Sequence, residues 1–213
     1  MATVIESIGT GQDFSTVTLW EADLANKNSI DDIIGEMINQ AFDEQVTLNN
    51  STPNSVVLSV EASNRHDGTA GTGARNVASS ARTWFVATPN NFSYTLEWIE
   101  FDANSNAGPS INGESASPND VSSINTCLIH DQNGGNSFQG FIIAATRDLR
   151  VMNCIAYVNV RSTSINYGLQ LDSDKAPGGC LNNTIWGVEN ASGDAHGIRI
   201  FTDSTNGDVK NNI

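Results

Sequence analysis

The chain is poor in basic residues and in cysteine, and each shortage argues against a class of function. Its 213 residues include 10 Lys and Arg against 24 Asp and Glu, which gives a formal net charge of −14. Such an excess of negative charge repels phosphate backbones, so nucleic acid is not expected as a partner. Three cysteines, Cys127, Cys154 and Cys180, do not suggest a disulfide framework.

Long apolar runs are also missing. No stretch approaches the roughly 20 apolar residues that a membrane-spanning helix needs, so membrane insertion is not expected. The first residues lack the basic and hydrophobic segments of a secretory signal. The three histidines, His66, His130 and His196, lie far apart and match no metal-ligand spacing. We therefore expect neither a metal site nor a cofactor.

A spacing that recurs through the second half is the most informative feature that is present. A short polar-small-aliphatic pattern recurs, and its middle residues are Cys127, Cys154, Thr184 and Asn212, with steps of 27, 30 and 28. A second ladder, of glycines followed by aliphatic residues, runs in phase with it at Gly140, Gly168 and Gly197, with steps of 28 and 29. Two motifs that keep one period predict an all-β solenoid, a parallel β-helix with about 27–30 residues per rung.

The alternation within these segments predicts which side chains face the core. Ile198 and Ile200 are expected to point inward while Arg199, between them, points to solvent. Cys127 and Cys154 occupy the same place in adjacent rungs, so we expect their side chains to lie one above the other. As the core contribution of the other ladder we expect the side chains of Ile155, Tyr157 and Ile185.

Weaker signals extend the ladder toward the N-terminus. Residues 94–101 read as one strand with period two, and Ile99 lies 29 residues before Leu128. Gly113 lies 27 residues before Gly140. Residues 55–61 and 83–87 also read as strands.

Residues 64–81 have little apolar content and contain several basic side chains, namely Arg65, His66, Arg75 and Arg82. One interpretation is a surface loop between two rungs. The other is a basic loop that reaches an acidic glycan or a neighbouring subunit.

Residues 1–28 read as a strand, a glycine turn and an amphipathic helix. Ser15 or Thr16 can cap this helix, and one of its faces carries three apolar residues, Val17, Trp20 and Leu24. The first rung of a solenoid has an open edge of unpaired backbone, so we expect the helix to cover that end. Residues 29–213 are predicted to form the parallel β-helix. The sequence stops in the middle of a repeat without a C-terminal cap, so we expect a longer protein or another chain to cover that end.

The opening segment carries a resemblance to a known family. Residues 8–21, with the sequence IGTGQDFSTVTLWE, resemble the N-terminal cap of right-handed parallel β-helix proteins of the pectate-lyase-like superfamily. The likeness is greatest to β-helix structural proteins of tailed bacteriophages. Residues 30–41 fit either a helix or a strand by their spacing, but the segment matching residues 33–39 resembles a strand in that family. The resemblance implies the fold across the whole chain and leaves the activity open.

Two aspartates could form a site on the outer face. Asp174 lies six residues after Gly168, and Asp203 lies six after Gly197, which would place them on adjacent rungs. Carboxylates about 5 Å apart can serve as acid and nucleophile of a retaining glycosidase, or hold a calcium ion. Both residues also lie in turn-like stretches, where aspartate needs no catalytic explanation.

Two other residues are candidates for binding a ligand without chemistry. Trp186 follows the inward Ile185, so its ring is expected to point outward as a platform for a ligand. The alternative is that it packs under a loop or against a partner chain. Arg199 is a second candidate, on the solvent side of its strand.

These observations favour a structural protein of a phage particle, such as a tail fibre, spike, capsid-attached fibre or decoration protein. We expect a homotrimer, located in the virion, that contacts other virion proteins and presents its surface for attachment or stabilisation. A host surface polysaccharide is a further expected partner. The alternative is a polysaccharide depolymerase, a glycoside hydrolase or lyase, that acts on host surface glycan.

Overall fold

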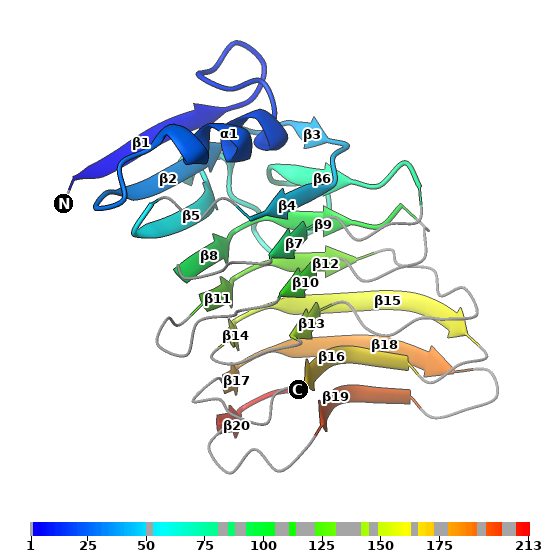
Figure 1. Ribbon diagram of the computed structural model, residues 1–213. Coiled ribbons are helices and arrows are strands. Elements are labelled where there is room, and N and C mark those ends of the chain that lie inside the picture. The colour runs from blue at the N-terminus through cyan, green and yellow to red at the C-terminus, as the bar shows by residue number, and fades with distance from the viewer. Residues whose placement is uncertain are drawn as a thin grey trace.

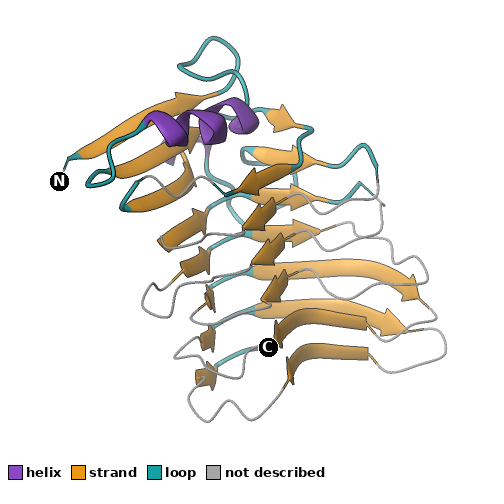
Figure 2. Ribbon diagram, viewed as in Figure 1, coloured by secondary structure: helices purple, strands orange, loops and turns teal. Residues whose placement is uncertain are grey.

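The chain winds into a β-solenoid with three parallel sheets, as Figures 1 and 2 show for this computed structural model. The structure describes the following parts of the chain: 2–49, 53–80, 85–87, 93–104, 111–113, 122–130, 142–144, 149–162, 166–172, 179–190, 195–201 and 208–213.

The first sheet has eight strands that succeed one another along the solenoid. In that order they are β1 (Thr3–Ile8), β2 (Asp32–Met37), β5 (Ser55–Val60), β8 (Ser93–Glu97), β11 (Ser122–Asn125), β14 (Leu149–Met152), β17 (Gly179–Leu181) and β20 (Asp208–Lys210).

The second and third sheets have six strands each. The second consists of β4 (Val46–Leu48), β7 (Phe85–Ala87), β10 (Ile111–Gly113), β13 (Ile142–Ala144), β16 (Asn166–Asp172) and β19 (Ala195–Phe201). The third consists of β3 (Ala41–Phe42), β6 (Arg75–Val77), β9 (Glu100–Asp102), β12 (Leu128–His130), β15 (Ile155–Ser162) and β18 (Thr184–Asn190). The paired strands are parallel throughout these sheets, which confirms the predicted all-β solenoid.

The N-terminal helix α1 (Val17–Asp23) covers the β1 end of the solenoid (Figure 1). Thr16 is its N-cap, because the Thr16 hydroxyl accepts a hydrogen bond of 3.1 Å from the backbone N–H of Leu19. A 3-10 turn, Leu24–Asn26, follows the helix directly. Val17, Trp20 and Leu24 are buried, so the predicted cap helix and its apolar face are confirmed.

Gly35 in β2 makes room for this helix. A Cβ atom at that position would lie 2.5 Å from Cε2 of Trp20, so no larger residue fits beneath the indole. The segment is a strand, as the resemblance indicated, and β2 pairs with both β1 and β5. Glu44 fastens the helix from below, because its carboxylate oxygens accept hydrogen bonds from the backbone N–H groups of Val17 and Thr18.

Left-handed backbone marks the corner between the first and third sheets. Trp98, Thr126, Asn153, Asn182 and Asn211 have φ values of 63°, 52°, 55°, 56° and 55°. Asparagine tolerates this conformation better than most residues. The Nδ2 groups of Asn182 and Asn211 each donate to the Oδ1 of the preceding asparagine in this column, at 3.4 and 3.2 Å. The repeating polar pattern in the sequence therefore arises from a corner turn and its side-chain ladder.

The register of the strands corrects the predicted alignment of the repeats. Leu128 pairs with Ile155, and Ile155 pairs with Thr184, so Thr184 is not the counterpart of the two cysteines. The residue before it, Asn183, takes that place, because one rung is a residue shorter than the pattern suggested. Glu100, rather than Ile99, pairs with Leu128.

Two further alignments differ from the prediction in the same way. Gly113 pairs with Ala144 rather than with Gly140, and Ile142 pairs with Leu169. Residues 94–101 form two strands rather than one, because the left-handed turn at Trp98 separates β8 from β9.

The core predictions for the cysteines hold, and one for the third sheet does not. Cys127 and Cys154 are both buried in adjacent rungs, and Cys180 is buried as well. Burial raises the pKa of Cys180 to about 12, so this thiol stays protonated. In β15, the buried residue is Ala156, and its neighbours Ile155 and Tyr157 are half-buried on the opposite face, so the prediction that they point inward is wrong.

Two other inward predictions fit the structure. Ile185 pairs with Ala156 and packs against the core, and so does Ile198 in β19. The side chains of Arg199 and Ile200 lie outside the described part of the structure. In the described residues, neither α1 nor another helix is long and apolar enough to span a membrane.

Candidate functional site

The site candidates from the sequence fall in differently described regions. Asp174 and Asp203 lie outside the described residues. Arg199 lies in β19, where its backbone pairs with Gln170, but its side chain also lies outside the described part. Trp186 in β18 is 71% exposed, so its ring points outward as predicted.

Trp186 is the last member of a row of side chains on the outer face of the third sheet. The strand register places Asp102, His130, Tyr157 and Trp186 at the same position in β9, β12, β15 and β18. Neighbouring strands in a sheet lie about 4.8 Å apart, so these four residues follow one another along the solenoid. The rings of His130 and Tyr157 are stacked, with centroids 5.4 Å apart and planes inclined by 13°. We call these four residues the outer row.

A buried ion pair adjoins the outer row. Oε1 of Glu100 accepts a hydrogen bond from Nε2 of His130 at 2.7 Å, and Glu100 and His130 are only 0% and 2% exposed. The same oxygen accepts the backbone N–H of Gly71, also at 2.7 Å. On the other side of the imidazole, Nδ1 of His130 lies 4.0 Å from Oδ1 of Asp102. The histidine therefore lies between two carboxylates.

The environment of Glu100 keeps its carboxylate charged. Burial raises its pKa, but the hydrogen bonds from His130 and Gly71, and the charges of His130 and Arg75, together outweigh burial and leave the pKa below its usual value. The second oxygen, Oε2, is buried and has no hydrogen-bond partner. Buried charges of this kind are stable only while their partner is present.

The segment between β5 and β6 covers this pair. Residues 62–74, which we call the strap, begin with the 3-10 turn Ala62–Asn64 and close on themselves where the backbone N–H of Ala74 donates to the carbonyl of Asn64 at 3.1 Å. His66 reaches from the strap to the corner after β11, where its Nε2 lies 2.9 Å from the carbonyl oxygen of Thr126.

The basic side chains of this region contact the protein itself. The guanidinium of Arg65 lies 4.8 Å from the centre of the Trp98 ring, and the same ring lies 5.9 Å from that of His66. Arg75 belongs to β6, so residues 64–81 are not a loop throughout. These three side chains do not form one exposed basic surface, and Arg82 lies outside the described residues.

Sequence reasoning missed the pair of Glu100 and His130, although part of the signal was available. Asp102 and His130 are 28 residues apart, one rung of the solenoid, so the period alone would have placed them in one column. Burial of the outer face had no such signal, because the covering strap crosses from one rung to others. His66 acts on a residue 60 positions away.

The described residues give little support to catalysis at this pair. Glu100 and His130 are closed off from solvent by the strap, so a substrate cannot reach them in this conformation. Within the described segments, no group of three or more His, Cys, Asp and Glu side chains is placed to hold a metal ion.

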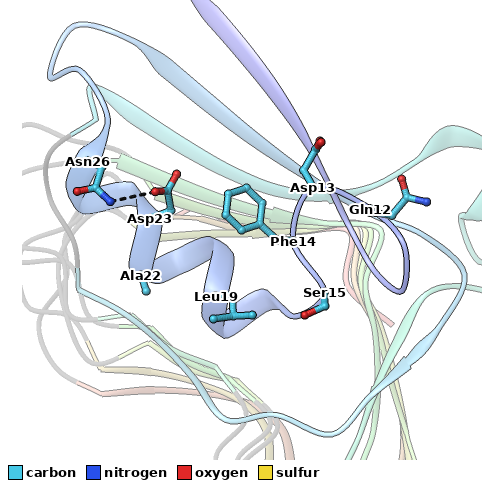
Figure 3. A pocket seen from close by; sticks show the side chains of 8 residues that line it. All are labelled: Gln12, Asp13, Phe14, Ser15, Leu19, Ala22, Asp23 and Asn26. Atoms are coloured by element: carbon cyan, nitrogen blue, oxygen red, sulfur yellow. Dashed lines mark hydrogen bonds between the residues drawn. The ribbon is translucent and has the colours of Figure 1, made fainter.

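A shallow depression lies elsewhere, beside the cap helix (Figure 3). Its lining residues are Gln12, Asp13, Phe14, Ser15, Leu19, Ala22, Asp23 and Asn26. Both carboxylates of this depression are already engaged. Asp13 accepts hydrogen bonds from the backbone and hydroxyl of Ser7, and Asp23 pairs with Lys27 at 2.6 Å. The depression therefore offers no free charged group for a ligand.

Comparisons of this chain with protein-family models, with curated proteins and with solved structures gave no match. The geometry of the outer face is therefore the basis for a functional proposal.

Proposed function

We propose that the chain is a non-catalytic attachment protein that binds a host surface glycan on the outer face of its third sheet. The observation that carries this proposal is the 71% exposure of Trp186 at the end of the outer row. Exposing a tryptophan ring to water is unfavourable, and a flat aromatic face is suited to stack against the apolar face of a sugar ring. The adjacent Tyr157 is half-buried and gives the same face a second aromatic ring.

The solenoid supports such a role mechanically. β15 and β18 are the longest strands of the third sheet and pair along most of their length, so they hold Tyr157 and Trp186 at a fixed separation. A binding face on paired strands loses less conformational entropy on binding than a flexible loop would. The excess of negative charge favours a neutral or basic glycan over an acidic one.

We place this protein in a virus particle, as a fibre, spike or decoration protein and as a homotrimer with other virion proteins as neighbours. The support is the resemblance of residues 8–21 to the caps of phage β-helix proteins. Mapping peptides of this chain in purified particles tests the placement, and their absence from intact particles would overturn it.

Replacing Trp186 by alanine is expected to weaken glycan binding at least tenfold without changing stability. The stacking face is lost, while the core beneath it keeps Ile185 and Ala156. Loss of such an aromatic anchor typically costs more than about 1 kcal/mol of binding free energy. The measurement is retention on an array of bacterial surface glycans, followed by calorimetry on the glycans that are retained.

The matched control is Leu19→Ala, which removes another exposed apolar side chain, 54% exposed, from the cap helix far from the outer row. This variant should bind as the original protein does. Equal binding by the Trp186→Ala variant and the original protein would contradict the assignment of the outer row as the binding face.

A further inference from the structure

We propose that the strap, residues 62–74, is an acid-released latch: it stays closed over Glu100, Leu128 and His130 while His66 is neutral and detaches when the His66 ring takes up a second proton. This inference rests on the contacts of the strap alone. It holds whether or not the outer row binds a glycan.

The hydrogen bonds of His66 fit only a neutral ring. Its Nε2 lies 2.9 Å from the carbonyl oxygen of Thr126, and a carbonyl only accepts, so Nε2 carries the hydrogen. Its Nδ1 lies 3.3 Å from the backbone nitrogen of Gly68, which only donates, so Nδ1 must accept. A second proton on Nδ1 would point at the N–H of Gly68 and replace a hydrogen bond by a repulsive contact.

The surroundings of the ring also oppose a second positive charge. His66 is buried, and it lies against the same Trp98 ring as the guanidinium of Arg65. A charged imidazole would have to share this ring with Arg65 while it is removed from water. Arg75 and His130 lie on the neighbouring β6 and β12 strands and are engaged with Glu100.

Two acidic groups act in the opposite direction. Burial lowers the pKa of His66, while the hydrogen bond to Thr126 and the charges of Glu100 and Asp67 raise it, and the net pKa lies below its usual value. The carboxylate of Asp67 turns back into the strap, where it accepts hydrogen bonds from Thr69 and Thr72. Asp102 lies beyond His130, at 4.0 Å from its ring.

The sign of the pH effect follows from this shift. In a detached strap, His66 would titrate near its ordinary pKa of about 6.5. Because the closed strap holds it below that value, closure is fully stable above about pH 6.5 and weakens as the pH falls, by up to about tenfold per pH unit. Glu100 and Asp67 have lowered pKa values, so their contribution is lost only at more acidic pH, below the usual carboxylate range.

The strap is built to move as a unit. Most of residues 67–72 are exposed, so closure buries little apolar surface. Gly68 and Gly71 have φ values of 92° and 81°, which glycine adopts without strain. The hydrogen-bonded contacts of this tip with the solenoid are those of His66 with Thr126 and of Gly71 with Glu100. Removing the first leaves one.

Hydrogen–deuterium exchange from pH 7.5 to 5.0 tests the latch, with each rate divided by the rate of the unstructured peptide at that pH. For the original protein, we expect protection of residues 62–74 to fall by up to tenfold per pH unit below about 6.5, while β1 and β2 stay protected. His66→Gln keeps one donor and one acceptor without a titrating group, and its protection should not change over this range. His196→Gln, in β19 of the second sheet, should respond as the original protein does.

Two results would overturn the latch: protection that does not change with pH in the original protein, or a response that persists in His66→Gln. If His66→Gln fails to fold, the pKa of His66 in the original protein decides instead, measured by NMR on histidine-labelled protein. A value below that of a free histidine, with strap signals that shift at the same pH, supports the latch. A value at or above it refutes the proposal.

Discussion

Replacing Trp20 by alanine is expected to lower the free energy of unfolding by about 3–5 kcal/mol, the usual cost of removing a large aromatic side chain from a packed core. The indole is fully buried between α1 and β2, directly above Gly35. Its Nε1 also donates to Oε2 of Glu6 in β1 at 3.1 Å, so the same substitution leaves a carboxylate with one partner fewer. Lys27 remains bound to the other oxygen of Glu6. Urea denaturation followed by circular dichroism measures the loss.

The control for this prediction lies one residue away. Leu19 is on the solvent side of the same helix and is 54% exposed, so Leu19→Ala should cost less than about 1 kcal/mol. A similar loss in both variants would mean that helix formation, rather than burial of Trp20, holds the cap. No loss in the Trp20→Ala variant would contradict the role of α1 as a packed cap.

Replacing His130 by leucine is expected to cost about 3–5 kcal/mol, because it leaves the Glu100 carboxylate buried without its charged partner. The remaining hydrogen bond, from the N–H of Gly71, cannot balance the charge. Removing both groups, with Glu100→Leu and His130→Leu together, should be less harmful than removing His130 alone, since no charge is then left in the interior. Denaturation of the two single variants and the double variant gives the complete cycle.

An exposed ion pair supplies the comparison. Asp23 and Lys27 are 2.6 Å apart on the cap, in contact with water, so Asp23→Asn should cost less than about 1 kcal/mol. If His130→Leu costs no more than Asp23→Asn, the charge on Glu100 is not buried as described. A double variant that is less stable than either single variant would likewise contradict the account.

The sequence predicted the architecture because the residues that repeat are the ones that the fold constrains most. Asn153 and Asn182 lie in left-handed corner turns, which few residues accept, and they recur at the interval of a rung. The apolar face of α1 is similarly constrained, since Trp20 must fit against Gly35. Local spacing was enough to identify both.

Register was less predictable, because rungs differ by one residue and the side chains that mark them are interchangeable in the pattern. Asn183 takes the position of a buried cysteine, and its Nδ2 donates to the carbonyl of Val151 and to Oδ1 of Asn212. A polar residue that satisfies its hydrogen bonds in the interior cannot be told from a turn residue by its type. The turn at Trp98 was missed for the same reason, because alternation continues across it.

The strap and the pair beneath it could not be predicted from periodicity at all. Leu128 and Glu100 lie on the face of the third sheet opposite the core, yet both are fully buried by residues from another rung. Alternation predicts which face a side chain takes but not what covers that face. For Trp186, the predicted outward direction was correct, and its role remains the proposal made above.

The most direct test of the proposed attachment function is whether a retained glycan is cleaved. The protein is incubated with each glycan that binds in a Trp186-dependent way, and new reducing ends and unsaturated products are measured over time. An attachment protein should bind without releasing either product. Product release that is abolished by Asp174→Asn with Asp203→Asn, in a protein that still folds, would contradict the account and identify a polysaccharide depolymerase.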